Sequence, residues 1–536
     1  MQPPSHLGHC ALVLHTHLPF VHHPDHEDFL EEDWLFEALS ECYLPLIEML
    51  RRRNRESLPW HLSLSLTPPL LSMLGIEGLR ERFVRFETKR LQLAGELLLE
   101  FEASNDPRLQ TARHYAERFE GNLKLYEELD RDVAGAFAEL AESSSLEILG
   151  SGATHGYLPL MLRGTSRAAQ VKIGIEVHEE VLGQRPRGFW LPECAYSEGV
   201  SQHLTTAGVE WTVLETGGIE GATPTPGERG SGGIRTADGL ICFGRHQSSS
   251  ARVWSSDSGY PGDPAYRELY RDIGFDRDYR KIRPYLKPDG IRRNVGLKFN
   301  AVTGDVALHE KSTWDPEAAR ERARVHGADF IRFQEEELQR LSGKTNTTPL
   351  LLCPYDTELF GHWWYEGVWF LEAVFDAAAA RSSQPHSILT TPGAFIDNNP
   401  VTTVAEPLES SWGEDSCHRV WLNETNQHFW RYLHEMEERM ITLAGEYKDP
   451  GEQERRLLDQ MARELLLAQS SDWLFILTME TSAHYAERRF RDHVHRFFAL
   501  EDALLASRPI DSGDLERVER VDCLFPSISY QTFRSN

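Results

Sequence analysis

Residues 10–20, CALVLHTHLPF, predict the first strand and the kind of sheet this chain builds, because a β-favouring apolar run ends there in two histidines and a proline. Residues 60–70, WHLSLSLTPPL, repeat the plan with strict alternation of apolar and polar positions. The same plan, an apolar run that ends in a polar loop with Gly or Pro, recurs at residues 146–160, 187–196, 209–215, 349–360 and 387–395. These seven stretches are the predicted strands.

Stretches with helical periodicity separate most of the strands. They cover residues 81–101, 113–140, 166–184, 316–341 and 363–381. Strands that alternate with helices predict a parallel sheet. Six or seven such units in about 400 residues favour a closed barrel of the TIM type, so the expected class is α/β.

Two segments interrupt the alternation. Two successive helical patterns near residues 76–145 predict a helical insertion, and residues 218–295, rich in Gly, Ser, Pro and Asp, predict a lid or substrate-binding excursion. Residues 1–400 are therefore expected to form the barrel domain. After them the strand signal fades, and three helical stretches, at residues 426–447, 451–473 and 482–505, predict an all-α domain over residues 401–536.

Composition excludes several classes of protein. The 536 residues carry a formal net charge of −27, which argues against nucleic acid or anionic membranes as partners. Seven scattered cysteines without a CxxC pair indicate neither a zinc cluster nor a disulfide framework. The N-terminus lacks the features of a signal peptide, and no run approaches the length of a membrane span. We expect a soluble cytoplasmic protein with no cofactor and no metal; its oligomeric state is not indicated.

Candidate catalytic residues gather where predicted strands end. In an α/β barrel these ends meet at one mouth. They carry His15, His17, His155, Trp190, Glu193, Asp356, Glu358 and His362. Two carboxylates among aromatic and histidine side chains are what glycosyl transfer requires, since one attacks the anomeric carbon and the other moves the proton.

Each candidate has an alternative interpretation. Glu193 could be an ion-paired loop residue, and Glu358 and Glu366 compete with Asp356 for the second role. The histidines could belong to a metal-dependent hydrolase, although there is no HExxH motif and no third ligand at a suitable spacing. A sugar-binding protein without catalysis is a third alternative.

Five motifs occur in order along the chain: HTHLPF (15–20), ATHGYLPL (153–160), GFWLPECAY (188–196), PYDTELFGHWW (354–364) and SSDW (470–473). Together they closely resemble glycoside hydrolase family 57 and, more narrowly, its 1,4-α-glucan branching enzyme subgroup. The resemblance extends over nearly the whole chain, including residues 253–276 and the C-terminal helices.

This resemblance implies a distorted (β/α)7 barrel, a C-terminal helical domain that completes the active site, and a retaining mechanism on α-1,4-glucans. Glu193 matches the nucleophile and Asp356 the general acid/base, with carboxyl groups about 5–5.5 Å apart. The expected substrate contacts are His15, His17, His155, Trp190, Tyr260, His362, Trp363, Trp412, Trp421 and Asp472. For Trp412, Trp421 and Asp472, packing or capping is the alternative role.

Two departures from the family pattern bear on the balance between transfer and hydrolysis. Thr481 stands where a substrate-contacting Gln is expected, and no tyrosine lies between Leu214 and Gly259, where the family carries one on a mobile loop. His246 is expected near the tip of that loop instead. Because an aromatic lid would keep water from the intermediate, an α-amylase or 4-α-glucanotransferase is the alternative to a branching enzyme.

Overall fold

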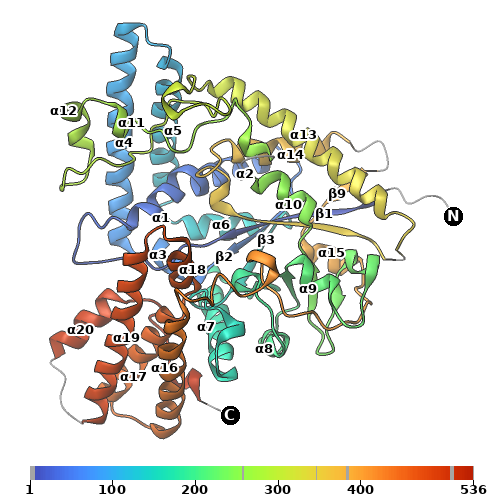
Figure 1. Cartoon of the computed structure of the whole chain (residues 1–536), viewed down its shortest axis with the longest axis vertical. Coiled ribbons are helices and arrows are strands. Elements are labelled where there is room, and N and C mark those ends of the chain that lie inside the picture. Colours follow the sequence, from blue (N-terminus) through green and yellow to red (C-terminus); the bar gives the residue numbers. More distant parts are fainter. Residues whose placement is uncertain (1–5, 256–258, 346, 382–385, 507–511, 535–536) are drawn as a thin grey trace.

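A single sheet organises the barrel part of the molecule (Figure 1). The computed structural model describes residues 6–255, 259–345, 347–381, 386–506 and 512–534. Within them, seven parallel strands form the main sheet: β1 (His6–Thr16), β2 (Leu62–Leu66), β3 (Leu146–Ser151), β4 (Gly188–Trp190), β5 (Trp211–Leu214), β7 (Ile241–Gly244) and β8 (Leu350–Asp356). Their order is β7-β5-β4-β3-β2-β1-β8.

The two edges of this sheet meet. Just beyond β7, Arg245 forms a parallel bridge with Leu352 of β8, and the His246 amide donates to the Leu352 carbonyl at 2.8 Å. The sheet is therefore curled into a distorted barrel of seven strands, and the predicted fold class is confirmed.

The structure differs from the prediction in which segment supplies the seventh strand of the barrel. Residues 387–395 were expected in the barrel, but β9 (His386–Leu389) pairs with the start of β1 instead. The remaining barrel strand, β7, lies inside the expected excursion at 218–295, together with the short antiparallel β6 (Ile234–Arg235). The four residues of β7, ICFG, are too few to show a periodicity among glycines and serines.

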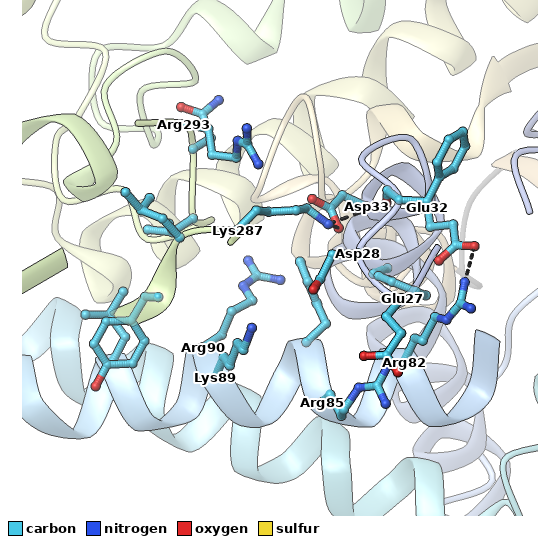
Figure 2. Close-up of a pocket in the computed structure, with 18 residues that line it drawn as sticks. Glu27, Asp28, Glu32, Asp33, Arg82, Arg85, Lys89, Arg90, Lys287 and Arg293 are labelled. Carbon is cyan, nitrogen blue, oxygen red and sulfur yellow. Dashed lines mark hydrogen bonds and ion pairs between the residues drawn. The ribbon is translucent and has the colours of Figure 1, made fainter. Parts of the chain in front are cut away.

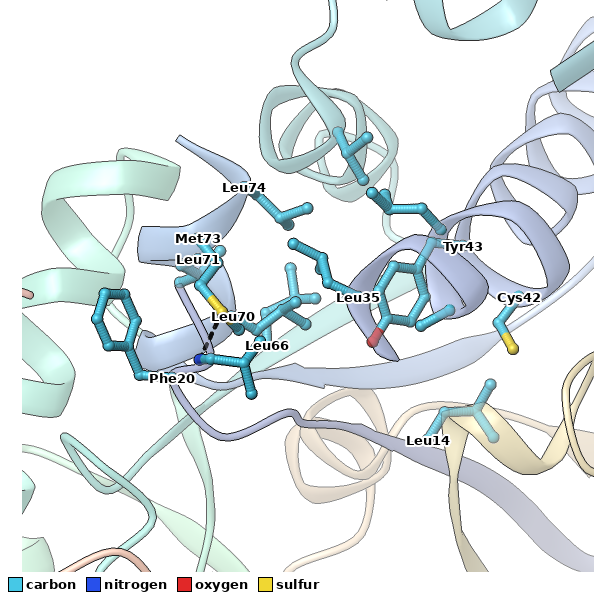
Figure 3. Close-up of a cluster of buried hydrophobic side chains, with 14 of the residues drawn as sticks. Leu14, Phe20, Leu35, Cys42, Tyr43, Leu66, Leu70, Leu71, Met73 and Leu74 are labelled. Atoms are coloured by element: carbon cyan, nitrogen blue, oxygen red, sulfur yellow. Dashed lines mark hydrogen bonds between the residues drawn. The ribbon is translucent and has the colours of Figure 1, made fainter. Parts of the chain in front are cut away.

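Alternate residues of β1 face opposite sides of the barrel wall. Ala11 and Val13 pack in the interior core. Leu12 and Leu14 belong to the outer core, and Figure 3 draws Leu14 together with side chains of α1 (Glu32–Ala38) and α3 (Pro68–Leu74) that belong to the same cluster. His15 continues the interior series and so lies at the carboxyl end of the barrel interior.

Helices cover the outside of the barrel and form the expected insertion. Between β2 and β3 lie α4 (Glu77–Ser104), α5 (Leu109–Glu128) and α6 (Val133–Ala141). The chain turns between α5 and α6 at Asp130 and Arg131, which both have positive φ. The other helices of the barrel part are α2 (Leu44–Arg55), α7 (Gly164–Leu182), α8 (Val200–Thr206), α9 (Thr216–Glu220), α10 (Gln247–Trp254), α11 (Ile273–Asp276), α12 (Tyr279–Ile282), α13 (Pro316–Leu341), α14 (Gly367–Ala379) and α15 (Pro392–Asn398).

The C-terminal part is a helical bundle below the barrel in Figure 1. It consists of α16 (Gln427–Glu446), α17 (Glu452–Ala468), α18 (Ser471–Met479), α19 (Ala483–Leu505) and α20 (Ser512–Val521). The stretch 451–473, expected as one helix, breaks at Gln469 and Ser470, and α20 was not expected. At this break Ser470 bridges Gly156, and the Ser471 amide donates to the His155 carbonyl at 3.0 Å. The bundle is thus joined to the loop after β3.

No described helix has the length and apolar character needed to cross a membrane.

Candidate active site

Glu193 follows β4 in a strained turn. Its backbone has φ 63° and ψ 23°, a left-handed conformation that is uncommon for a residue with a side chain. Two backbone hydrogen bonds hold this turn: the Trp412 amide donates to the Glu193 carbonyl at 3.0 Å, and the Cys194 amide to the Leu191 carbonyl at 2.8 Å. Such strain persists where the surroundings enforce it, typically at functional sites.

Three distant segments hold the Glu193 carboxylate. The Trp412 indole donates to Oε2 at 2.8 Å, and the Ser471 hydroxyl of α18 donates to Oε1 at 2.8 Å. His155 Nδ1 lies 3.7 Å from Oε1. The side chain keeps 12 % of its surface exposed, so it is oriented by the protein and still open to a ligand.

Asp356 ends β8, next to His15 in the register of the sheet. Burial, followed by the nearby carboxylates of Glu358 and Glu193, raises the pKa of Asp356 well above its ordinary value. Burial also raises the pKa of Glu193, but only to about 6, because hydrogen bonds from Trp412 and Ser471 favour its charged form. Near neutral pH, Glu193 is ionised while the surroundings of Asp356 favour its protonated form. Two carboxyl groups with separated pKa values can serve as base and acid.

Three histidines adjoin the carboxyl groups. His15 Nε2 and His155 Nε2 are 3.0 Å apart, so one ring donates and the other accepts. Burial, and then the charge of His17, lower the pKa of both rings well below the ordinary value. His17 stacks on His155 with ring centroids 3.9 Å apart. The three rings therefore form one face, of which His15 and His155 are uncharged.

His17 carries the charge of this cluster because of Asp472. Its Nε2 lies 3.0 Å from Asp472 Oδ2, and its Nδ1 lies 2.9 Å from the Thr67 hydroxyl. Although burial opposes the charge, Asp472 raises the pKa of His17, and His17 in turn lowers the pKa of the buried Asp472 to about 2. This ion pair links the loop after β1 to α18 across the barrel–bundle contact.

Two tryptophans complete the inner part of the site. Trp190 is fully buried and stacks on His15, with centroids 4.4 Å apart and planes 11° apart. Trp412 meets Trp190 edge-on at 5.1 Å. Trp190 has no open face for a sugar, so its expected role as a substrate contact is corrected: it packs behind the histidines. Trp412 is held in direct contact with Glu193.

Two expected substrate contacts lie elsewhere. Trp421 is only 1 % exposed and stacks on Tyr157, so it has no open face for a sugar. Tyr260 donates from its hydroxyl to Asp329 of α13 at 2.8 Å and stacks on His326, in the packing between α13 and its neighbours. Both expectations are corrected: these aromatic rings belong to the core, which the motif match did not distinguish from the site.

His246 is also not at a loop tip. It lies between β7 and α10, and its backbone completes the barrel through Leu352. Its Nδ1 is 2.5 Å from the Ser249 hydroxyl. Because β7 and α10 are regular elements packed on the barrel, the expectation of a mobile tip at this residue is wrong.

A second group of polar side chains lies beyond Asp356; the sequence interpretation named its Glu358 and His362 but missed Tyr43 and Glu41. The Tyr43 hydroxyl donates to Glu358 Oε1 at 2.5 Å, and His362 Nδ1 lies 2.9 Å from Glu41 Oε2. Tyr43 and Glu41 belong to a π-helical turn, Leu39–Tyr43, between α1 and α2. Such turns occur often at functional sites, but apolar periodicity does not reveal them. Trp363, beside His362, is 46 % exposed.

The pH dependence of activity follows from the Glu193 environment. The expected role of Glu193 as nucleophile requires its ionised form, so this role predicts that kcat/KM falls as the pH drops through about 6. Trp412→Phe removes a donor that stabilises the carboxylate, so this acidic limb should move to higher pH. A pH–rate profile of both proteins checks this, and an unmoved limb would contradict the assignment.

A pair of carboxyl groups at the carboxyl end of an α/β barrel, flanked by aromatic rings, fits the class of glycoside hydrolases. The chain belongs to glycosyl hydrolase family 57, whose sequence model matches residues 11–405. Residues 432–533 match the model described as 1,4-alpha-glucan branching enzyme, C-terminal. The resemblance inferred from the five motifs is confirmed.

Relatives match over nearly the full chain. A 1,4-alpha-glucan branching enzyme of Thermococcus kodakarensis is 28 % identical, over 96 % of this chain and 76 % of its own length. Among solved structures, the α-amylase AmyC from Thermotoga maritima has a TM-score of 0.92 at 37 % identity, with 99 % of each chain covered. A branching enzyme of this family from Pyrococcus horikoshii has a TM-score of 0.87 at 30 % identity, covering 99 % of this chain and 97 % of its own.

Proposed function

We propose that this protein is a 1,4-α-glucan branching enzyme, which cleaves an α-1,4-glucan with retention and transfers the released chain to a C6 hydroxyl. The observation that carries the proposal is the Glu193 carboxylate, which is held by Trp412 and by Ser471 of the C-terminal bundle. The bundle region that matches the branching enzyme domain is thus joined to the catalytic carboxylate through α18.

In the first step, Asp356 donates its proton to the glycosidic oxygen while Glu193 attacks the anomeric carbon. The bond to the leaving chain breaks, and a glucosyl ester forms on Glu193. In the second step, Asp356 takes the proton from a C6 hydroxyl, whose oxygen attacks the same carbon and releases Glu193 as a carboxylate. Retention requires that the two carboxyl groups lie about 5–5.5 Å apart around the sugar.

His15, His17, His155 and Asp472 are proposed to line the sugar site next to Glu193. Every ring nitrogen of the three histidines already has a partner, in Ser65, Thr67, Ser471, Asp472 or another of the rings. The Asp472 carboxylate can still accept from sugar hydroxyl groups, and the histidines are proposed to position it and Glu193. His362 and the exposed Trp363 are proposed to contact the glucan further from the cleavage point. The 1–400 and 401–536 division is proposed as the two domains of the enzyme.

Hydrolysis is the second candidate, favoured by the similarity to the α-amylase AmyC and by the lack of a tyrosine between Leu214 and Gly259. Amylose digestion separates the two. For a branching enzyme we expect new α-1,6 linkages, seen after treatment with a debranching enzyme, together with weaker iodine staining and no rise in reducing ends. Reducing ends that rise throughout the reaction would identify an amylase.

Metal-dependent hydrolysis predicts a different result in the same assay. His17, His155 and Asp472 each offer a ligand atom, and these atoms lie within 4.8 Å of one another, so the third ligand that the spacing lacked is present. However, His17 and Asp472 already bond to each other directly. We expect activity to survive exhaustive dialysis against EDTA; loss and recovery with added metal would favour the hydrolase alternative.

A cytoplasmic location is part of the proposal. It is supported by the seven cysteines, all of which are free thiols.

A further inference from the structure

A charged cavity lies apart from the carboxyl pair, between helix α4 and the segment at residues 285–295 (Figure 2). Its volume is about 310 Å³, within the range of small-molecule sites. The lining includes neither Glu193 nor Asp356 and none of the histidines of the active site. The proposed reaction therefore does not account for it.

Six cationic side chains line this cavity: Arg82, Arg85, Lys89, Arg90, Lys287 and Arg293. Four come from α4, and Figure 2 shows Arg90 extending from that helix towards Lys287. The lining carries only four carboxylates, on Glu27, Asp28, Glu32 and Asp33. A local excess of positive charge is unusual in a chain whose net charge is −27.

Part of this charge is used by the fold. Arg82 pairs with Glu32 at 2.6 Å, Lys287 with Asp33 at 2.7 Å, and Arg293 with Asp289 at 2.7 Å. Arg85 and Lys89, by contrast, have no ion-pair partner among the described residues, and both are exposed. They are four residues apart on one helix face, a spacing at which like charges destabilise a helix.

Arg90 is the most buried cation of this lining. Its side chain is only 4 % exposed, and Nη2 donates to Glu41 at 2.7 Å and to the Gly296 carbonyl at 3.1 Å. Nη1 forms an ion pair with the buried Glu87 at 3.6 Å, and the guanidinium lies over the Phe119 ring. Within the described part of the chain, Nε alone has neither a hydrogen-bond acceptor nor an ion-pair partner, so Arg90 can offer one further donor to a ligand.

We propose that this cavity binds an organic phosphate with at least two negative charges. Glucan chains are uncharged, so binding of the proposed substrate does not require these cations. Arginine and lysine side chains recognise phosphate oxygens. Phe29, Phe86 and Tyr285, all half-buried in the same lining, offer apolar surfaces for the organic part of the ligand. A sugar phosphate and a nucleotide both carry the phosphate that the cations would bind. They differ in the organic part, which the three aromatic rings would contact.

Calorimetric titration of the whole protein with pyrophosphate, ADP and glucose 6-phosphate tests this site. We expect saturable binding of pyrophosphate that weakens with rising salt, and tighter binding of whichever organic phosphate the rings accept. Arg85→Ala with Lys89→Ala should weaken binding by about tenfold or more. The matched control, Lys124→Ala with Lys172→Ala, removes the same charge from exposed positions on α5 and α7 and should leave binding unchanged.

Removing negative charge from the same cavity provides a second test, with the opposite expected effect on binding. Glu27→Gln with Asp28→Asn removes two exposed carboxylates from the lining and should tighten binding of the same anions several-fold. Absence of saturable binding by all three compounds would overturn the proposal. So would equal affinity in the Arg85/Lys89 variant, or binding of maltotriose at this cavity with no dependence on either charge change.

Discussion

Glu193→Gln is expected to lower the rate of glucan turnover by about a hundredfold or more, with little change in the melting temperature. The amide keeps the size of the side chain; its oxygen can accept from the Trp412 indole and its NH2 can donate to the Ser471 hydroxyl, so the turn should persist. It cannot form the glucosyl ester, because it lacks the carboxylate that attacks the anomeric carbon. Initial rates on amylose, with circular dichroism as the folding check, measure this.

A carboxylate at the other end of the barrel provides the matched control. Glu147, at the start of β3, accepts hydrogen bonds from Trp211 and Gly393, and Glu147→Gln should keep most of the activity. Glu193→Ala should in addition yield β-glucosyl azide from an activated glucosyl donor when azide is supplied. Near-normal turnover by Glu193→Gln would show that another group is the nucleophile.

Asp356→Ala should lose a similar factor on amylose, about a hundredfold or more, but for a different reason. Without the proton donor, cleavage should depend on the leaving group: a glucosyl fluoride needs no protonation and should still react with Glu193. Added azide should then give α-glucosyl azide, the retained product. Comparing amylose with the fluoride donor, with and without azide, measures this signature.

Glu358 is the neighbouring carboxyl group that could be confused with Asp356. Burial raises the pKa of Glu358 to about 7, and its Oε1 accepts from Tyr43. If Glu358 only supports this part of the site, Glu358→Gln should lose less activity than Asp356→Ala and should show no azide rescue. The reverse order would reassign the acid/base to Glu358.

The fold was predictable where the strands are long enough to show their pattern. The runs at β1, β2 and β8 end in polar residues, and the structure places these ends together because parallel strands present their carboxyl ends at one edge. β7 was not predicted because its four residues, in a segment rich in Gly and Ser, are too few to show a periodicity. The seventh strand of the barrel was therefore assigned to β9 instead.

The histidines and carboxyl groups proposed for the site could be predicted because they stand at strand ends, but Ser471 and Tyr43, which contact them, could not. Ser471 becomes a Glu193 donor only through the break between α17 and α18, which helical periodicity conceals. Tyr43 reaches Glu358 from a π-helical turn that reads as ordinary helix in the sequence. Trp421 and Tyr260 were predicted as substrate contacts but lie in the core. An aromatic residue at a motif position can pack in the core instead of binding substrate.

The central claim, that Glu193 is the residue that becomes glucosylated, is tested most directly by trapping the intermediate. A 5-fluoro glucosyl fluoride should react and then turn over slowly, and digestion followed by mass spectrometry locates the sugar. We predict a single labelled peptide from residues 188–196, modified at Glu193, and no label in Glu193→Gln. A sugar found on Asp356, Glu358 or Asp472 instead would contradict the account.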